Sequence, residues 1–276
     1  MSLTSNFYAG VNTRVWTNIA RLINPSDTND ATVWDDEATP ATRDMTFFNS
    51  NATLAPKYSN PGAMLLPSIQ FNGSNQFLLG VNYTSASSKT LSNIFANNGK
   101  TIIIAFQMTG NATNNGTVYQ NSSLLSESGA YFGLFAKSSA GVHTLYAYNW
   151  DGNADSNSGI TFSLNTTYVV MVRHDGTTLN ISLLSGVGGS TRTDQSAASG
   201  NTSTMTGTLR MGRSYQAHYF TGLIGEVYTD NTDLGSTNTP LSNMVTRWLG
   251  SSAVSAHILK SGRSLMKGIE KSISEL

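Results

Sequence analysis

Short runs of β-branched and aromatic residues, separated by clusters of Gly, Asn, Ser and Thr, fill the chain between residues 68 and 228. Runs of this kind with polar breaks are typical of antiparallel strands joined by turns. Residues 144–148 and 178–183 alternate in polarity, as strands do when one face meets a core and the other meets solvent. The predicted strands are 68–71, 101–108, 131–136, 144–148, 168–174, 178–184, 208–211 and 223–228.

Two of these segments carry further information. Residues 102–106 are continuously apolar, which favours a strand covered on both faces, although a buried helix is an alternative. Asp175-Gly176 stands between two predicted strands. This dipeptide predicts a tight type I′ hairpin, because both turn residues of that type need positive φ.

The two ends of the chain have a different pattern. Four prolines interrupt the first 61 residues, so we expect an irregular N-terminal arm with one short helix near residues 18–23. Residues 241–249 predict a helix, and residues 256–273 predict an amphipathic tail helix. This tail packs either on its own sandwich or on a neighbouring subunit or larger particle. The predicted organisation is an arm over 1–30, a β-sandwich over 31–250 and a helical tail over 251–276.

Several segments occur in the order typical of one family. They are Val33-Trp34-Asp35-Asp36, Phe71-Asn72-Gly73-Ser74-Asn75-Gln76-Phe77, residues 100–106, 209–213 and 219–227, and Arg247-Trp248-Leu249-Gly250. With these segments the chain resembles the concanavalin A-like lectin/glucanase (laminin G-like) domains found in phage virion and bacterial surface proteins. The resemblance implies an all-β, two-sheet antiparallel jelly-roll sandwich, often calcium- and carbohydrate-binding, which also serves as a passive building block.

The amino-acid composition limits the kinds of partner that the chain is expected to bind. Hydrophobic residues make up 39% and charged residues 12% of the chain, and 16 Lys and Arg balance 16 Asp and Glu. This balance lacks the positive charge that binds nucleic acid, so we expect no nucleic-acid partner. Because the net charge is near zero, copies of the chain repel one another only weakly, which favours a homo-oligomer. We find no basic leader with an apolar run and no stretch of about 18 apolar residues, and expect neither conventional secretion nor membrane insertion.

One loop has the pattern of a metal site. Asp151, Asn153, Asp155 and Asn157 place an oxygen-bearing side chain at every second position, as a loop that wraps calcium does. The sixth-position Gly and twelfth-position Glu of an EF-hand are missing, and Phe162 stands at the twelfth. The two interpretations are a calcium site and a polar loop between strands.

Aromatic residues precede this loop. Trp150 adjoins the loop, and Tyr146 and Tyr148 lie on the strand predicted before it. If calcium binds the loop, these rings could stack on a sugar. The alternative is that they are ordinary core or sheet-surface residues.

Catalytic motifs are not evident. Retaining glycanases of this fold carry Glu-x-Asp-x-x-Glu or a close variant along one strand, so that two carboxylates lie about 5 Å apart. Glu226 has no acidic neighbour before Asp230, and the four histidines are scattered. We therefore expect Glu226 to be structural and the chain not to be an enzyme.

Three functions remain in order of preference. The first is a non-enzymatic phage virion protein, a head-decoration or fibre-like component. It would lie at the virion surface, after assembly in the host cytoplasm, in contact with other virion or capsid proteins. The second is a carbohydrate-binding adhesin, with or without calcium. The third is a glycan hydrolase.

Overall fold

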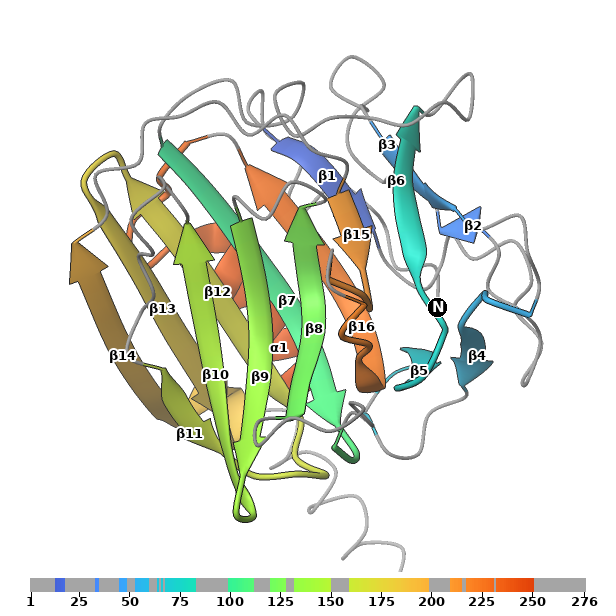
Figure 1. Ribbon diagram of the computed structural model, residues 1–276. Coiled ribbons are helices and arrows are strands. Elements are labelled where there is room, and N and C mark those ends of the chain that lie inside the picture. The colour runs from blue at the N-terminus through green and yellow to red at the C-terminus, as the bar shows by residue number, and fades with distance from the viewer. Residues whose placement is uncertain are drawn as a thin grey trace, which may run out of the picture.

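The computed structural model describes residues 13–17, 33–34, 45–48, 53–59, 64, 66, 68–82, 99–111, 120–127, 132–149, 159–198, 209–214, 217–230 and 232–250. Their strands form two antiparallel sheets packed face to face, with a helix, α1 (Thr239–Leu249), on one side (Figure 1). This confirms the predicted all-β, two-sheet sandwich.

One sheet, here called sheet A, has the order β14-β13-β12-β7-β16-β5-β4, with β1 paired to β16. Its strands are β1 (Thr13–Thr17), β4 (Lys57–Ser59), β5 (Ser68–Asn72), β7 (Gly99–Met108), β12 (Tyr168–Asp175), β13 (Thr178–Ser185), β14 (Thr191–Ala198) and β16 (Thr221–Asp230). A short 3₁₀ turn, η3 (Val187–Gly189), separates β13 from β14.

The other sheet, sheet B, has the order β11-β10-β9-β8-β15-β6-β3-β2. Its strands are β2 (Val33–Trp34), β3 (Met45–Phe48), β6 (Leu78–Asn82), β8 (Gln120–Glu127), β9 (Phe132–Ser139), β10 (Val142–Asn149), β11 (Ile160–Phe162) and β15 (Leu209–Met211). All eight strands predicted from periodicity are present in the two sheets. The structure adds strands that the pattern does not predict, including four within the first 60 residues.

The main core lies between the two sheets. Inward-facing residues of β7, β12 and β16 meet those of β8, β9 and β10 in a single cluster of buried side chains. Within this cluster the Phe106 ring lies 5.8 Å from the Tyr168 ring and 6.1 Å from the Phe162 ring. The three aromatic residues join sheet A, through β7 and β12, to β11 of sheet B.

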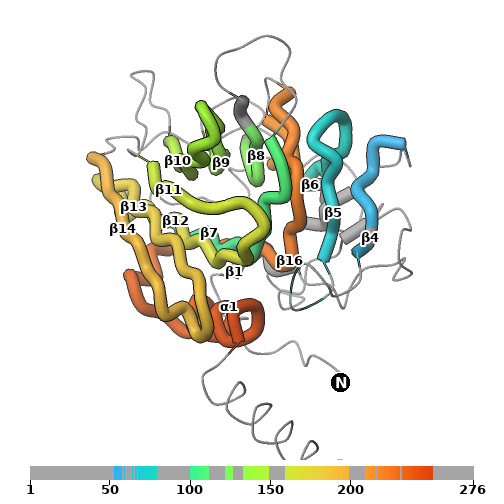
Figure 2. Tube along the Cα trace, turned by 90° about the horizontal axis from the view of Figure 1, so that it is seen from below, coloured from blue at the N-terminus to red at the C-terminus, as the bar shows by residue number. Residues whose placement is uncertain are grey.

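Helix α1 covers part of the outer face of sheet A, over β7, β12 and β16. Met244 and Trp248 pack with Ile103, Ala105 and Met171 in a second buried cluster. Figure 2 shows α1 on one side of the sandwich and β8, β9 and β10 on the other. Strand β7 is therefore buried on both faces, which confirms the interpretation of its continuous apolar run.

The ends of α1 are set by local signals. Asn238 precedes the helix, and its side-chain oxygen accepts a hydrogen bond from the Leu241 backbone N–H at 2.8 Å. Pro240 stands in the first turn, where its missing N–H is not needed. Gly250, with φ of 74°, follows the last helical residue. The predicted helix over 241–249 is confirmed.

The hairpin between β12 and β13 is confirmed in position but not in type. Only Gly176, with φ of 103°, has positive φ there. Asp175 stays in the strand, where its carboxylate accepts hydrogen bonds from the backbone N–H groups of Thr177 and Thr178. A type I′ turn needs two residues at positive φ, so that part of the prediction is wrong. The carboxylate closes the turn instead.

The predicted helices near residues 18–23 and over 256–273 lie outside the described residues. In the part of the chain that the structure describes, no helix is long and apolar enough to cross a membrane.

Candidate functional site

The structure places Tyr146 and Tyr148 on β10, half-buried, while their neighbours Leu145 and Ala147 are fully buried in the core. The two tyrosines therefore lie on the outer face of sheet B. Trp150 and the candidate calcium ligands Asp151, Asn153, Asp155 and Asn157 lie outside the described residues. The metal prediction thus remains a prediction.

A third ring joins the two tyrosines. Phe135 of β9 is the cross-strand partner of Tyr146, and their rings stack with centroids 6.2 Å apart. The Phe135 ring also meets Tyr148 edge to face at 5.2 Å. Phe135, Tyr146 and Tyr148, called the aromatic face below, form a set of three packed rings on the neighbouring strands β9 and β10, whose positions Figure 1 shows.

Two glycines fix where the tyrosine rings lie. A Cβ atom on Gly133, the cross-strand partner of Tyr148, would come within 2.4 Å of Tyr148 Cε1. A Cβ on Gly159 would come within 2.9 Å of Tyr146 Cε1. Each ring therefore occupies space that any other residue at the glycine would need. The tyrosine rings therefore lie over the two glycines, close to the sheet.

A cation lies beside the rings. The Nζ atom of Lys137 is 4.6 Å from the centroid of Tyr146 and 5.8 Å from that of Phe135. Such an ammonium is attracted to the ring electrons and still carries N–H donors. The aromatic face thus combines apolar ring surface with phenol and ammonium groups that can donate hydrogen bonds.

The order of β9 and β10 is set by their turn. Ala140 and Gly141 connect the strands with φ of 48° and 80°. A two-residue turn with both residues at positive φ matches the right-handed twist of a hairpin. This turn brings Phe135 opposite Tyr146 and Gly133 opposite Tyr148. Phe135, Gly133 and Lys137 were missed from sequence, although the alternation of β9 could have placed Phe135 and Lys137 together.

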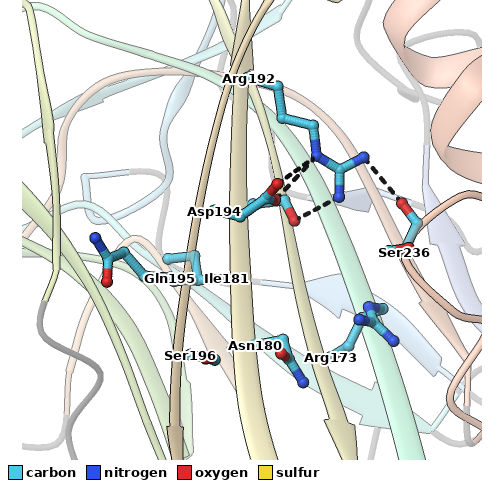
Figure 3. Close-up of a pocket in the computed structure, with 9 residues that line it drawn as sticks. Arg173, Asn180, Ile181, Arg192, Asp194, Gln195, Ser196 and Ser236 are labelled. Carbon is cyan, nitrogen blue, oxygen red and sulfur yellow. Dashed lines mark hydrogen bonds and ion pairs between the residues drawn. The ribbon is translucent and has the colours of Figure 1, made fainter.

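A second candidate is a polar pocket of about 500 Å³ on the outer face of sheet A, where β12, β13 and β14 meet the segment before α1 (Figure 3). Arg192 Nε donates to both oxygens of Asp194, at 2.9 and 3.0 Å. Its two terminal nitrogens donate to Ser182 Oγ and to the Ser236 carbonyl. Arg173, also in the lining, forms an ion pair with Asp233.

The charges in this pocket are largely matched within it. Partial burial raises the pKa of Asp194, but hydrogen bonds from Ser182 and Arg192 and the Arg192 charge outweigh that effect and hold the pKa below its ordinary value. None of the described residues that line the pocket is aromatic. It therefore lacks the apolar ring surface that distinguishes the aromatic face.

Glu226, the carboxylate considered for catalysis, is fully buried beneath α1. It accepts a hydrogen bond from Trp248 Nε1 at 2.6 Å and lies 3.4 Å from an Arg247 terminal nitrogen. These contacts tie the helix to β16, which supports the structural role expected from the sequence.

The described histidines do not form a metal centre. His143 shares a hydrogen bond with Ser138 in the buried interior, and His174 accepts one from the Gly176 N–H. In the described residues no three His, Cys, Asp or Glu side chains come together in a way that could hold a metal ion.

No family model matches the sequence, and no curated protein matches it. Solved structures do. A Trypanosoma rangeli sialidase, in a covalent intermediate with 2,3-difluorosialic acid, has a TM-score of 0.52 at 14% identity; the match covers 90% of this chain and 37% of the sialidase. This likeness supports the lectin-like β-sandwich, without assigning it to the concanavalin A/laminin G-like family.

Two further structures match more weakly. The enzymatically active domain of bacteriophage CBA120 tailspike protein 2 has a TM-score of 0.46 at 12% identity, covering 80% of this chain and 35% of that one. The binding domain of botulinum neurotoxin serotype G has a TM-score of 0.46 at 10% identity. This match covers 85% of this chain and 50% of the toxin domain. The chain spans between about a third and a half of the length of the structures it matches.

The prediction that the chain is not an enzyme is contradicted by the comparison with solved structures, because a sialidase is among the structures that match it. That prediction rested on a missing motif along one strand. Such a motif reveals only carboxylates that are close in sequence, whereas groups from separate strands can converge in the fold. The missing motif therefore does not decide whether the chain has enzymatic activity.

Proposed function

We propose that this chain binds glycans through the aromatic face of sheet B. The observation that carries the proposal is the set of three packed rings, Phe135, Tyr146 and Tyr148, on a sheet face opposite the helix-covered one. Binding sites for organic ligands combine apolar and aromatic surface with a few placed polar groups. A sugar ring has that mixed character, with C–H groups on its faces and hydroxyls at its edge.

The geometry supports a preformed site. Because the Phe135 ring packs against both tyrosine rings, less side-chain freedom remains to be lost on binding. Ordering a rotamer-rich side chain costs about 0.5–1.5 kcal/mol, so rings held in place bind more favourably. The Lys137 ammonium beside Tyr146 supplies a donor for a sugar hydroxyl or carboxylate.

The first experiment screens the purified chain on a glycan array and then measures affinity for the best ligand by calorimetry. We expect Tyr146→Ala and Tyr148→Ala each to weaken binding about tenfold, or ~1.4 kcal/mol, through the lost ring contact. Gly133→Ala keeps every ring but displaces Tyr148, so it should also weaken binding. Gly110→Ala is the matched control, because the nearest atom to its Cβ is Thr221 Cγ2 at 3.4 Å.

Two results would count against the proposal. A folded chain that binds no glycan contradicts glycan recognition, and binding that all three variants leave unchanged moves it away from the aromatic face. Repeating the titration with a chelator tests the predicted calcium loop at Asp151–Asn157, where loss of affinity is the supporting result. Mass spectrometry of the recovered glycans shows whether the chain also cleaves them.

We also propose the setting in which this face acts. The chain is a phage virion component with a domain of the concanavalin A/laminin G-like family. It is a head-decoration or fibre-like protein that is displayed together with other virion proteins. Support comes from the resemblance in segments such as Phe71-Asn72-Gly73-Ser74-Asn75-Gln76-Phe77 and from the balanced charge. Finding the chain at high copy number by mass spectrometry of purified particles is the expected result, and its absence from them would contradict this setting.

A further inference from the structure

Strand β14 (Thr191–Ala198) is the outermost strand at one end of sheet A. It pairs with β13 over eight consecutive residue pairs, from Thr178↔Ala198 to Ser185↔Thr191, without a shift of register. All eight of its residues are exposed or half-buried. On the side away from β13, none of the described strands pairs with it. Among the described residues, β14 therefore ends sheet A as a long and regular edge strand.

This edge carries few of the features that normally keep sheet edges apart. Natural edge strands are protected by charged side chains, especially Lys, by Pro, by bulges or by shortness, and of these β14 carries only the charges of Arg192 and Asp194. Strand β14 has the sequence Thr-Arg-Thr-Asp-Gln-Ser-Ala-Ala, with no Pro and no Lys, and its pairing to β13 contains no bulge. Such an edge is suited to accept a further strand.

The charges on β14 are complementary to themselves. Arg192 and Asp194 are two residues apart and therefore on the same face. Both contribute to the pocket on the outer face of sheet A (Figure 3). The Asp194 side chain is 58% exposed and that of Arg192 is 26% exposed. Each Arg192 terminal nitrogen also has a second N–H that the contacts to Ser182 and Ser236 do not use.

Symmetry restricts how two copies of β14 can pair. In an antiparallel pair the facing residues lie on the same side of the sheet, so a two-fold axis must pass through one residue position. An axis at Asp194 places the two carboxylates opposite each other, which is repulsive. An axis at Thr193 places Arg192 of each copy opposite Asp194 of the other, giving two attractive pairs.

We propose that a second copy of this chain pairs with β14 in antiparallel register centred on Thr193, joining the two A sheets into one continuous sheet. The ion pair that Arg192 and Asp194 form within one chain extends to the other copy in a network of four charges. The two-fold axis runs perpendicular to the sheet, so both aromatic faces point to the same side of the dimer.

The test is sedimentation equilibrium of the full chain over a wide range of concentrations, where the expected result is a dimer. In R192D, a negative charge at position 192 of each copy faces the negative Asp194 of the other copy. In D194R, a positive charge at position 194 of each copy faces the positive Arg192 of the other. Each variant should therefore weaken the homodimer at least ~10-fold. An equimolar mixture of R192D and D194R should form a heterodimer, because every negative charge then faces a positive one.

The mixture separates pairing between chains from damage within a chain. Each single variant loses its own Arg192–Asp194 pair, and mixing restores only contacts between copies. The double swap R192D/D194R keeps both kinds of pairing and should dimerise like the unchanged chain, even if the single variants fold poorly. A monomer at all concentrations, a different stoichiometry, single variants that dimerise normally, or a mixture that stays monomeric would each overturn the proposal.

Discussion

Lys100 is an unusual residue for the interior of a sandwich. Only 6% of its surface is exposed, and it lies on β7 opposite His174, which is fully buried. It shares a strand face with Ile102 and Ile104 of the main core. Burial lowers the pKa of Lys100 to about 8 from its ordinary value of 10.5. The folded chain thus holds the charged ammonium at a cost in free energy.

The sign of the pH dependence follows from this pKa. Between about pH 8 and 10.5 the unfolded chain keeps the Lys100 proton while the folded chain has lost it. The free energy of unfolding therefore rises with pH across this window, by up to roughly 3 kcal/mol. Lys100→Met should be more stable than the unchanged chain near pH 7 and lose this rise.

Urea unfolding of both chains at a series of pH values measures the effect. The difference between the two curves isolates Lys100, because the other titrating groups are common to both. Parallel curves through the whole window would show that Lys100 keeps its ordinary pKa in the fold.

At the scale of the element, a bulge in β16 determines how α1 docks. The register between β16 and β7 shifts between Ile224 and Glu226, which pair with Phe106 and Ala105. Gly225 is the extra residue. The shift turns Ile224 toward the main core and Glu226 toward the helix, where Trp248 donates a hydrogen bond to it. A bulge of this kind re-aims the side chains that follow it.

Gly225 also makes room for the helix. A Cβ atom there would lie 2.2 to 2.5 Å from three carbons of the Trp248 ring. Gly225→Ala should therefore displace the indole, break its hydrogen bond to Glu226 and lower the free energy of unfolding by about 3 kcal/mol.

Chemical denaturation of Gly225→Ala beside Gly110→Ala provides the comparison, with near-ultraviolet circular dichroism as a monitor of Trp248. Equal stabilities of the two variants would mean that α1 tolerates the extra methyl group.

Elements with strong local signals were predictable from sequence, and those that depend on partners were not. The alternation of β10 and β13 and the apolar run of β7 identify them directly. Strand β14 has no apolar alternation and forms because β13 offers it an edge. Likewise, β1 is a strand through its pairing with β16. The bulge at Gly225 leaves no mark in the sequence pattern, although its position decides the environment of Glu226.

The same distinction applies to the candidate site. Tyr146 and Tyr148 follow from the alternation within one strand, so they were identified in advance. Phe135 and Gly133 join them only through the register that the Ala140-Gly141 turn sets between β9 and β10. The sequence shows which residues share a face of one strand but does not align that strand with its neighbour.

Considered as a whole, the molecule has two unlike sides. On the side of sheet A, α1 packs over part of the outer face and buries a cluster of side chains around Trp248. The side of sheet B presents half-buried residues such as Phe135, Lys137, Thr144 and Tyr146, whose side chains point away from the core between the sheets. Stability and surface chemistry are thereby carried by different residues.

Because α1 packs on only one side of the sandwich, the other side is more tolerant of amino-acid substitution. Substitutions outside the core usually alter stability by less than about 0.5 kcal/mol, so the outer surface of β9 and β10 can acquire new side chains while the sandwich persists. The chain can therefore be used as a scaffold, in which a library varied at Phe135, Lys137, Thr144 and Tyr146 would supply new recognition specificities on one unchanged framework.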